Sequence, residues 1–417
     1  MARKAPYAAS LGGRVEDSGA AALLVIAASS NDPDLAPFVG DSHLGESFLI
    51  ARAGDDEPPH LGFLTAMERQ EAAATGCRML APTRLGISEL YERGLPPAEL
   101  WVELLRRGLE AAAVPAGRVA VAGRPGAGVL LAAQRALGEA GWELVDGAAL
   151  VRRLRKRKSA EELAEARRVA AVTVAAFERV AETLAASTAR GGELWLEGKR
   201  LTAGRLRGEV AALLARHGLQ QPEGNIVAAG ADSAVPHTRG NDGRVLRPGE
   251  SLIVDLFPRG RLFADCTRTF CVGEPPEALA AAHAAVFESL AAAYREARPD
   301  VTGWQLQRRA CGGFAEAGYA TVQENPETVR GYVHGLGHGV GYELHELPSF
   351  RRAAELADGR LETGDLFTLE PGLYDPGASW GLRLEDLCVL GPAGVQNLTP
   401  APYFLDPRAW SDRGPTG

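Results

Sequence analysis

The chain has 417 residues, a formal net charge of −8, 46% hydrophobic residues and 24% charged residues. This composition is typical of a soluble globular protein and excludes disordered, collagenous and fibrous chains. At roughly 100 to 200 residues per domain, the length predicts two or three domains. The acidic balance makes the chain a poor binder of nucleic-acid phosphates, so we expect no nucleic acid as a partner.

The cysteines and the apolar runs predict where the protein works. The cysteines are odd in number, widely spread and without a CxxC pair, which predicts reduced thiols: Cys77, Cys266, Cys271, Cys311 and Cys388. No run of 18 apolar residues occurs, so we expect no membrane partner. The first residues lack the apolar stretch of a secretory signal, and these features together predict a cytoplasmic location.

Short apolar runs alternate with helical periodicity in the first part of the chain. The runs at 22–28, 47–51, 60–65 and 118–122 predict strands, and the patterns at 97–112 and 129–140 predict helices. Strands that alternate with helices predict an α/β domain. Gly123, Gly126 and Gly128 follow the last strand, but their spacing matches neither GxGxxG nor a Walker A loop. We therefore favour a strand-to-helix turn over a nucleotide site.

A basic run ends this part of the chain. Residues 152–158 contain six basic residues in seven. A nucleic-acid patch is one alternative, but we favour a solvated linker end that leads into the next helix. Ser159 and Glu162 have the spacing of a capping box for that helix. We place the domain boundary here, with an N-terminal domain over 1–155 and a second domain over 156–417.

The second part of the chain begins with helical patterns and then turns to strands. Residues 159–187, 206–217, 276–297 and 303–317 predict helices. Residues 251–257 and 262–272 flank a short turn at 258–260 and predict a β-hairpin. Further strand-like segments occur at 332–345, 365–374 and 382–390.

Three of the histidines lie close together in HGLGHGVGYELHE, namely His334, His338 and His345. Glycines occupy every second position from 335 to 341, so an extended chain has one bare face and one face that carries side chains. Bare positions let another backbone or a ligand approach closely. A glycine-rich loop with incidental histidines is the alternative for this segment alone.

Four carboxylates fall within otherwise apolar strand patterns. Asp255 and Asp265 lie on the two arms of the hairpin, and Glu370 and Glu385 lie in the later strand-like segments. Isolated buried carboxylates cost several kcal/mol or stay protonated, and converging carboxylates repel one another. Two divalent cations cancel a charge of −4. Four carboxylates and an imidazole therefore favour a dinuclear centre of Mn²⁺, Co²⁺, Fe²⁺ or Zn²⁺.

The order D-x9-D-x-T-R-T, HGLGHGVGYELHE, EPG and R-x-E-D resembles the pita-bread metallopeptidases over roughly residues 160 to 405. That family includes methionine aminopeptidase, aminopeptidase P and prolidase. An N-terminal strand-and-helix domain that ends in K-S-x-E-E is similar to the prolidase, aminopeptidase P and creatinase branch. The implied fold is of the α/β (α+β) class, with a smaller creatinase-like α/β domain followed by a pita-bread catalytic domain.

The resemblance implies two divalent metal ions per chain, Mn²⁺ or Co²⁺ first, with Zn²⁺ or Fe²⁺ as alternatives. The implied ligands are Asp255, Asp265, His338, Glu370 and Glu385, with Asp265 and Glu385 bridging both metals. A hydroxide between the metals is the implied nucleophile, and Glu370 the implied general base. Thr267 is expected to fix Asp265 by a hydrogen bond.

The resemblance also implies roles for residues around the metals. His237 matches the histidine that contacts the scissile amide, His345 the histidine at the carbonyl oxygen, and His334 a histidine of the proline-specific branch. Arg383 is expected to brace the metal carboxylates. Arg351 matches an arginine that grips the carboxylate of a dipeptide, with Arg352 as an equal rival.

The implied activity is that of an Xaa-Pro dipeptidase, acting on a small peptide with proline at the second position. Aminopeptidase P, which acts on longer peptides, shares nearly every motif and is the main alternative. A creatinase-like hydrolase and a non-enzymatic binding module are weaker alternatives, because both typically lose metal ligands that this chain retains. A homodimer is implied by the family alone.

Two departures from the family pattern concern the hairpin. Nine residues separate its aspartates, where the family usually has ten, so we expect a tighter turn that Gly260 permits. Leu256, Phe257 and Pro258 also follow Asp255 where the family commonly has a glycine. That change is expected to reshape one wall of the pocket.

Overall fold

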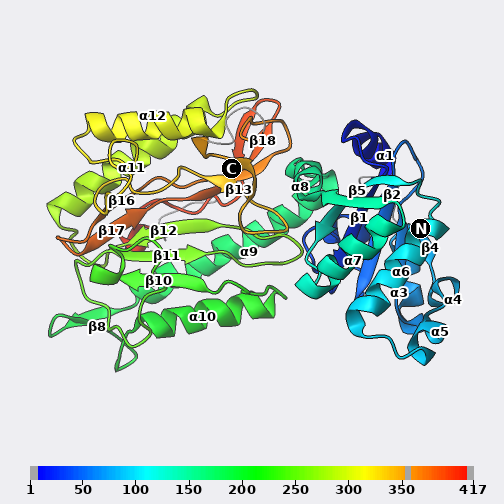
Figure 1. The fold of residues 1–417 in the computed structure, drawn as a ribbon. Coiled ribbons are helices and arrows are strands. Elements are labelled where there is room, and N and C mark those ends of the chain that lie inside the picture. Colours follow the sequence, from blue (N-terminus) through cyan, green and yellow to red (C-terminus); the bar gives the residue numbers. More distant parts are fainter. Residues whose placement is uncertain (1–7, 353–357, 411–417) are drawn as a thin grey trace. The chain divides into compact units, whose positions relative to one another are not determined.

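The computed structural model describes residues 8–352 and 358–410 (Figure 1). The chain divides into two compact units, Met1–Arg155 and Lys156–Gly417. None of the described helices is both long and apolar enough to cross a membrane.

The first unit is built on a six-stranded sheet in the order β4-β3-β2-β1-β5-β6. Its strands are β1 (Ala22–Ala27), β2 (Ser47–Arg52), β3 (His60–Phe63), β4 (Arg78–Leu80), β5 (Gly117–Gly123) and β6 (Trp142–Asp146). The helices of this part are α1 (Ala8–Asp17), α2 (Ala36–Val39), α3 (Arg69–Ala74), α4 (Pro82–Leu85), α5 (Ile87–Glu92), α6 (Pro97–Ala111), α7 (Ala127–Glu139) and α8 (Ala148–Lys156). Strand β1 is parallel to β5 and antiparallel to β2.

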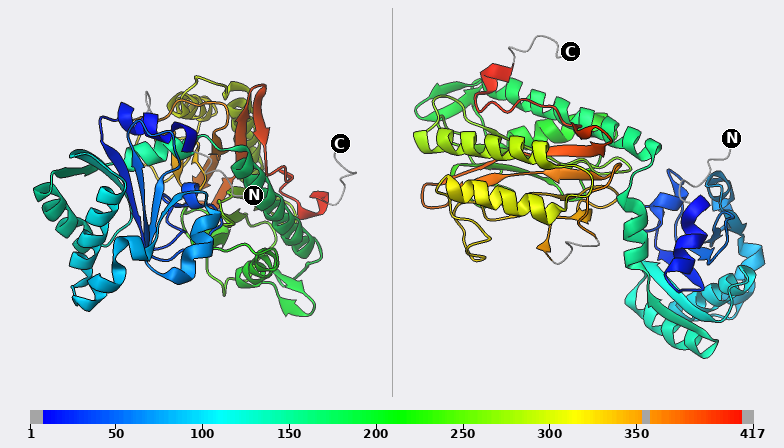
Figure 2. Two further views of the ribbon diagram at one scale, coloured as in Figure 1. Left: turned by 90° about the vertical axis from the view of Figure 1, so that its right-hand side faces the viewer. Right: turned by 90° about the horizontal axis from the view of Figure 1, so that it is seen from above.

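Both faces of this sheet are covered, which explains the uninterrupted apolar run of β1. Leu23 and Val25 pack on one face with residues of α1 and α8. Leu24 and Ile26 pack on the other face with residues of α6 and α7 (Figures 1 and 2). A strand buried on both faces reads as continuously apolar rather than alternating. The predicted α/β domain is thus confirmed.

The glycine-rich segment after β5 is a turn. Gly123 has a φ of +90°, and a Cβ there would collide with the backbone of Ile26. The backbone N–H of Gly123 donates to Asp34 Oδ2 at 3.0 Å, and that of Arg124 donates to Asp32 Oδ2 at 3.0 Å. These amides are therefore satisfied by internal carboxylates, and the turn interpretation accounts for the segment.

The predicted solvated linker end at residues 152–158 is wrong for half of its cations. Arg155, Lys156 and Lys158 are 1%, 5% and 7% exposed. Arg155 Nη1 lies 3.1 Å from Asp34 Oδ1, and Lys156 Nζ lies 3.4 Å from Asp365 Oδ2. The sequence suggests solvation because these acidic partners lie far away along the chain.

The second unit combines four long helices with several small sheets. The helices are α9 (Ala160–Ala185), α10 (Ala203–Arg216), α11 (Glu277–Glu296) and α12 (Gly303–Glu316). Three strands form the sheet β10-β11-β12, namely β10 (Asn225–Ala229), β11 (Leu252–Leu256) and β12 (Cys266–Phe270). A five-stranded sheet in the order β14-β13-β15-β18-β19 contains β13 (His338–Gly339), β14 (Glu346–Ser349), β15 (Leu366–Leu369), β18 (Asp386–Gly391) and β19 (Gly394–Asn397). The remaining strands are β7 (Thr188–Arg190), β8 (Glu193–Leu196), β9 (Lys199–Arg200), β16 (Gly372–Asp375) and β17 (Trp380–Arg383).

The helices cover the strands in pairs. Helices α9 and α10 pack together and contact β12 and β10, while α11 and α12 pack together and contact β17 and β14. Figures 1 and 2 show α11 and α12 running side by side along one face of the strands. Helix α9 begins as predicted, because Ser159 and Glu162 form a capping box that satisfies two of its backbone amides.

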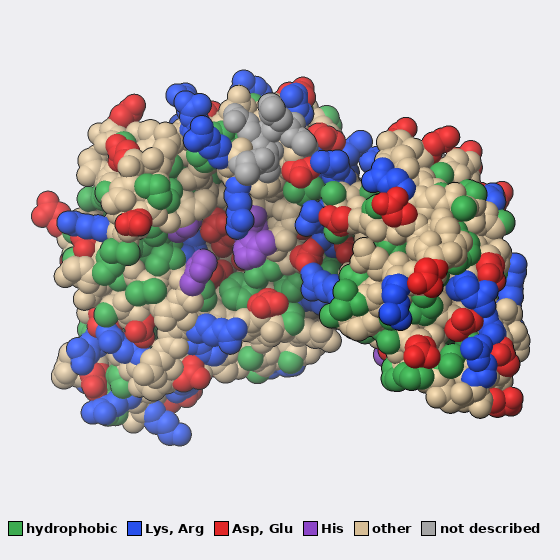
Figure 3. Space-filling model, viewed as in Figure 1, with side chains coloured by type: hydrophobic (Ala, Val, Ile, Leu, Met, Phe, Trp, Pro, Cys, Tyr) green, Lys and Arg blue, Asp and Glu red, His purple; other side chains and the backbone are tan. Residues whose placement is uncertain are grey.

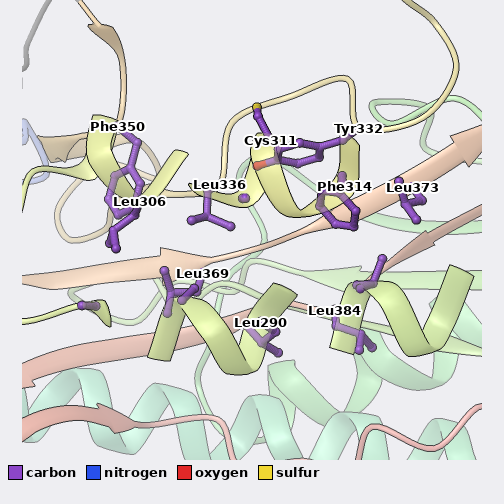
Figure 4. Close-up of a cluster of buried hydrophobic side chains, with 14 of the residues drawn as sticks. Leu290, Leu306, Cys311, Phe314, Tyr332, Leu336, Phe350, Leu369, Leu373 and Leu384 are labelled. Carbon is purple, nitrogen blue, oxygen red and sulfur yellow. The ribbon is translucent and has the colours of Figure 1, made fainter. Parts of the chain in front are cut away.

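The apolar core under α11 and α12 explains which way two of the glutamates point. Leu290 of α11 and Phe314 of α12 belong to one buried cluster with Leu369 and Leu384 of the strand segments (Figure 4). Successive side chains of an extended chain point to opposite faces. Each of these two strand leucines precedes a glutamate, so burial of the leucine directs Glu370 or Glu385 away from the core.

Three predicted strands differ from the structure. Residues 332–345 contain only the two-residue strand β13, and the segments at 365–374 and 382–390 each break into two strands. Asp255 is therefore the only one of the four carboxylates within a strand, and Asp265, Glu370 and Glu385 lie just outside strand ends. At Glu370 and Glu385 the chain passes from one sheet to another, because β15 and β18 belong to the five-stranded sheet and β16 and β17 to a two-stranded one.

Candidate metal centre

The hairpin of β11 and β12 supplies the two aspartates. Asp255 is 7% exposed, and its Oδ2 accepts a hydrogen bond from Arg383 Nη2 at 2.6 Å. Its other oxygen, Oδ1, is buried without a hydrogen-bond partner among the described residues. Asp265, 5% exposed, directly precedes β12. A buried carboxylate oxygen without a protein donor is a place that a cation or a water can occupy.

The turn of this hairpin is shaped by a close approach. Gly260 does not have a positive φ. A Cβ at this position would overlap Glu165 Oε1 of α9. Glu165 Oε1 accepts a hydrogen bond from the backbone N–H of Arg261 at 2.8 Å. A side chain at position 260 would require the ends of Glu165 and Arg168 to shift, whereas the backbone there does not adopt a conformation that only glycine favours.

Glu385 is held directly opposite Thr267. The two residues form a backbone bridge, with Glu385 N donating to Thr267 O at 3.0 Å. Thr267 Oγ1 donates to Glu385 Oε2 at 2.7 Å. The prediction that Thr267 fixes Asp265 is thus wrong, because a residue two positions away on one strand lies farther than the residue opposite on the next strand. The hydroxyl braces a different carboxylate of the same cluster.

His338 faces two of the carboxylates. Its Nδ1 lies 3.0 Å from the carbonyl oxygen of Gly339, which can only accept a hydrogen bond, so Nδ1 carries the proton. The unprotonated Nε2 lies 3.6 Å from Asp265 Oδ2 and 3.4 Å from Glu370 Oε1. A backbone acceptor that fixes the tautomer in this way is the usual partner of a metal-binding histidine.

The donor set fits divalent cations. One ligand atom each from Asp265, His338 and Glu385 lies within 4.8 Å of the others. Burial, together with the charges of neighbouring carboxylates, raises the pKa values of Asp265 and Glu385 well above their ordinary values. Burial raises the pKa of Glu370 to about 8 and lowers the pKa of His338 to about 3. The site therefore combines a neutral imidazole with four carboxylates, of which the neighbouring Arg383 offsets only part of the charge.

In the space-filling view, histidine and acidic side chains gather in a hollow of the second unit (Figure 3). Asp255, Asp265 and Glu385 are buried, whereas the side chains of His338 and Glu370 are 16% and 18% exposed.

Arg383, Tyr374 and His334 form a chain of hydrogen bonds beside the carboxylates. Arg383 Nη1 donates to the hydroxyl of Tyr374 at 2.7 Å, and this hydroxyl lies 3.0 Å from His334 Nε2. His334 Nδ1 donates to Gly335 O at 2.7 Å, so Nε2 accepts from the tyrosine. Of the candidate ligands, Asp255 is the one to which Arg383 donates a hydrogen bond. The sequence prediction missed Tyr374, although it lies shortly after Glu370 in EPGLY.

The other two histidines are exposed near the ligands. The rings of His345 and His338 have centroids 4.1 Å apart and lie edge to face. His237 lies close enough for its charge to add to the effect of burial in lowering the pKa values of His334 and His345. The structure thus brings the predicted histidines together around one group of carboxylates.

The two predicted substrate arginines are both exposed. Burial, the charge of His237 and the charge of Arg351 lower the pKa of His345, which places Arg351 on the His345 side of the site. Arg351 N donates to Ser349 Oγ at 3.2 Å, which fixes its backbone at the end of β14. Phe257, at the departure in the hairpin, is half-buried and packs beside Tyr374.

The sequence analysis gave no role to Arg268, the arginine of D-x-T-R-T, which is a second buried cation beside the site. Arg268 is fully buried and pairs with Asp386 Oδ1 at 2.7 Å. Its Nη1 donates to the carbonyl oxygen of Glu385 at 2.6 Å, and its guanidinium stacks 4.5 Å from the ring centroid of Tyr403. The pair therefore holds the backbone of a candidate ligand from behind.

The alternating glycines lie against other backbone. A Cβ at Gly337 would collide with the carbonyl oxygen of Thr368, and one at Gly339 with the carbonyl oxygen of Leu347. The predicted close approach of another backbone is confirmed at these two positions, whereas Gly335 has open space around it.

Comparison with known proteins identifies the family. The sequence matches the model of metallopeptidase family M24 over residues 164–392, more than half of the chain. The chain belongs to metallopeptidase family M24. A relative, the Xaa-Pro dipeptidase of Pyrococcus horikoshii, is 34% identical over 210 residues, or 48% of this chain and 55% of the relative. The chain thus matches about half the length of this curated relative.

Solved structures extend the likeness to both units. The dipeptidase PepE from Mycobacterium ulcerans matches with a TM-score of 0.71 at 25% identity, covering 96% of each chain. The X-Pro aminopeptidase from Thermotoga maritima also gives a TM-score of 0.71, at 21% identity, covering 95% of this chain and 98% of that one. The second likeness shows the fold alone. The M24 family and the pita-bread fold predicted from the sequence are thereby confirmed.

Proposed function

We propose that this M24 protein hydrolyses the peptide bond before proline in Xaa-Pro dipeptides. The observation that carries the proposal is the convergence of buried carboxylates on His338, with ligand atoms within 4.8 Å of one another. The name of the Pyrococcus horikoshii relative supports the substrate class. An X-Pro bond has no N–H, so a peptidase that needs this donor does not recognise it.

We propose two divalent ions, held by Asp255, Asp265, His338, Glu370 and Glu385. Four carboxylates and one imidazole favour Mn²⁺ or Co²⁺, with Zn²⁺ and Fe²⁺ as alternatives. When bound, the ions supply a water of lowered pKa and polarise the scissile carbonyl. The unpartnered Asp255 Oδ1 and the neutral His338 are the features of the chain that support this assignment.

The side chains around the ligands carry the proton movements. Glu370 is 18% exposed, so its carboxylate is placed to take a proton from the attacking water. As the C–O bond forms and the C–N bond breaks, this proton passes to the proline nitrogen. His345 donates a hydrogen bond to the carbonyl oxygen as its charge develops, and His237 contacts the departing nitrogen. His334, fixed by Tyr374, forms the adjoining wall of the site.

Arg351 is proposed to bind the carboxylate of the dipeptide. A guanidinium grips a carboxylate through two parallel hydrogen bonds. The carboxylate of an Xaa-Pro dipeptide follows directly after the scissile bond, so a clamp near His345 selects dipeptides over longer peptides. The position of Arg351 on the His345 side favours it over Arg352.

The test compares hydrolysis of Xaa-Pro and Xaa-Pro-Xaa by the wild type, Arg351→Ala and Arg352→Ala. Loss of a charge-assisted contact of about 1.5 to 3 kcal/mol lowers kcat/KM for the dipeptide roughly 10- to 150-fold. We expect this loss in Arg351→Ala, with tripeptide cleavage nearly unchanged, and little change in Arg352→Ala. A wild type that prefers the tripeptide, with neither arginine affecting the rate, identifies an aminopeptidase P instead.

We further propose that residues 1–155 form the creatinase-like N-terminal domain of the proline-specific branch and residues 156–417 the catalytic domain. The division of the structure between Arg155 and Lys156 supports this assignment. A homodimer and a cytoplasmic location remain predictions of the sequence resemblance. Light scattering of the purified chain measures the assembly state directly.

A further inference from the structure

Two oppositely charged side chains are buried together beside the candidate site. Lys158 Nζ and Glu346 Oε1 lie 2.6 Å apart, and the two side chains are 0% and 1% exposed. They are separated by 188 positions in the sequence. Removing two charges from water is costly, and their attraction offsets this cost only when the geometry and the remaining hydrogen bonds are good.

The additional hydrogen bonds of the pair are present. Lys158 Nζ also donates to the carbonyl oxygen of Lys156 at 3.2 Å. Glu346 Oε2 accepts from the backbone N–H of Glu343 at 3.3 Å. The carboxylate of Glu346 therefore closes the loop Glu343–Glu346, and His345 lies within this loop.

Glu346 controls the backbone on which His345 is carried. It directly follows His345 and opens β14, where it pairs with Gly339 of β13. Gly339 in turn directly follows the candidate ligand His338, whose ring lies 4.1 Å from that of His345. A displacement of Glu346 would therefore change the distance between the two imidazoles.

The fold leaves space for the pair at a glycine. A Cβ on Gly341 would overlap Glu346 Oε1 and would lie 2.9 Å from Lys158 Cε. Gly341 does not have a positive φ, so glycine is required here for the space that it leaves and not for its backbone conformation. Its carbonyl oxygen accepts from Phe263 N at 2.8 Å, close in sequence to Asp265. The pair thus occupies the point where the histidine loop meets the aspartate hairpin.

The backbone of Lys158 is bound to the segment before β15. Its backbone N–H donates to Gly364 O at 3.0 Å. The preceding lysine, Lys156, donates to Arg360 O at 2.6 Å and pairs with Glu362 at 3.1 Å. Residues 360–365 lead into β15, and Glu370 follows that strand. The basic run is therefore fixed to the segment that leads toward Glu370 and, through Lys158, to Glu346 itself.

We propose that the Lys158–Glu346 ion pair is a positioning device that holds His345 over the candidate metal centre. The inference rests on the proposed function of His345 and assigns a role to the basic run. The hydrogen bonds of the two residues run to the basic run and to the loop Glu343–Glu346, so we assign their effect on His345 to the loop. A buried pair can often be replaced by apolar side chains without loss of stability, which separates positioning from mere structural support.

The decisive variant is Lys158→Met/Glu346→Met in the full chain. It removes both charges and leaves neither unpaired, whereas each single replacement buries an uncompensated charge. The matched control is Arg295→Met/Glu288→Met, because that pair lies 2.8 Å apart on α11 with side chains 62% and 71% exposed. For each protein we would measure kcat and KM on an Xaa-Pro dipeptide, metal content and the thermal midpoint.

We expect the buried double variant to fold with a midpoint near that of the wild type and to keep its metal content. Its kcat should fall about 10- to 100-fold, the usual span for residues that orient a site from outside, with KM nearly unchanged. The surface control should keep wild-type kcat. A kcat within about twofold of the wild type in the buried double variant would overturn the proposal, as would a loss that follows metal content or the midpoint.

A spectroscopic measurement separates this inference from the proposed function. In metal-free protein labelled at histidine ring carbons, the His345 signal is assigned by its absence in His345→Ala. We expect the buried double variant to shift or broaden this signal and to leave the His283 signal in place. An unchanged His345 signal contradicts the positioning role. A wild type without activity on Xaa-Pro dipeptides contradicts the proposed function, and the spectra still decide the positioning role.

Discussion

The candidate site of the second unit buries charge differently from the first unit. In the first unit, the buried carboxylates Asp32 and Asp34 accept hydrogen bonds from the turn after β5, and Asp34 also pairs with Arg155. In the second unit, Asp255 keeps an oxygen without a donor, and Asp265 and Glu385 gain pKa values well above normal through burial and mutual repulsion. Buried charge is therefore not by itself a sign of function. The sign is an excess of carboxylates over the donors that the chain supplies.

The most severe test of this difference replaces one carboxylate in each unit. Asp265→Asn should abolish metal binding and lower kcat/KM by more than about 10³-fold, beyond the loss of a single oxyanion donor. Asp34→Asn should keep metal content and activity within about threefold, while losing roughly 1.5 to 3 kcal/mol of unfolding free energy with its charged hydrogen bonds. Elemental analysis, kinetics and urea unfolding measure these effects. Chelation should abolish wild-type activity, and Mn²⁺ or Co²⁺ should restore it.

The histidines offer a second test within the second unit. His345→Ala and His237→Ala should each lower kcat by about 10²- to 10⁴-fold and keep about two metals per chain. His283 serves as the control, because its Nε2 lies 2.7 Å from Tyr403 O, away from the carboxylates. His283→Ala should leave kcat unchanged. A metal-free His345→Ala protein would assign that imidazole to the metal centre and not to the substrate.

Two buried arginines allow a comparison of stability with activity. Arg268→Met and Arg155→Met each leave a buried carboxylate without its partner, and each should cost about 3 to 5 kcal/mol of unfolding free energy. Only Arg268→Met should also lower kcat in the folded fraction, because Arg268 holds the backbone of Glu385. Urea unfolding and active-site titration separate the two quantities. Equal losses of kcat in the two variants would contradict the expectation that only Arg268 supports the candidate site.

The smallest expected effect concerns pH in the first unit. Burial lowers the pKa of His60 from 6.5 to about 4, so the folded state requires the neutral ring. Above pH 6.5 this histidine leaves the free energy of unfolding unchanged. As the pH falls from 6.5 toward 4, the free energy of unfolding decreases, because the unfolded chain binds the proton at a higher pH than the folded chain. At pH 5 the loss should be less than about 2 kcal/mol, since solvent screens part of the shift. Urea unfolding at pH 7 and pH 5 should show a smaller acid loss for His60→Gln than for the wild type.

Local patterns in the sequence predict much of the fold. The apolar run of β1, the periodicity of α6 and α9, and the Ser159–Glu162 capping box all depend on residues close in sequence, and the structure contains each of them. The continuous strand expected at 332–345 does not form. Its glycines are used for close approach by the backbone at Thr368 and Leu347, so neighbouring segments and not the local pattern decide the conformation there.

The candidate site follows the same division. The residue types and order of the candidate ligands pointed to Asp265, Glu370 and Glu385, whose carboxylates lie near His338 in the structure, and their role as metal ligands stays a prediction. The partners of Arg268, Lys158 and Thr267 were not predictable, because each is paired with a residue more than 100 positions away: Asp386, Glu346 and Glu385, respectively. Alternation places such a side chain on a face but does not say which strand lies opposite.

The hydrogen bond between Thr267 and Glu385 spans 118 positions of the chain. Contacts of such high sequence separation form late, because closing a long loop must precede any gain from the contact. A chain that has folded only as far as the β11–β12 hairpin has both aspartates but neither His338 nor the two glutamates. If these residues are the ligands, we expect metal binding to require a nearly complete second unit, and a folding intermediate that contains only the hairpin should bind the ions weakly.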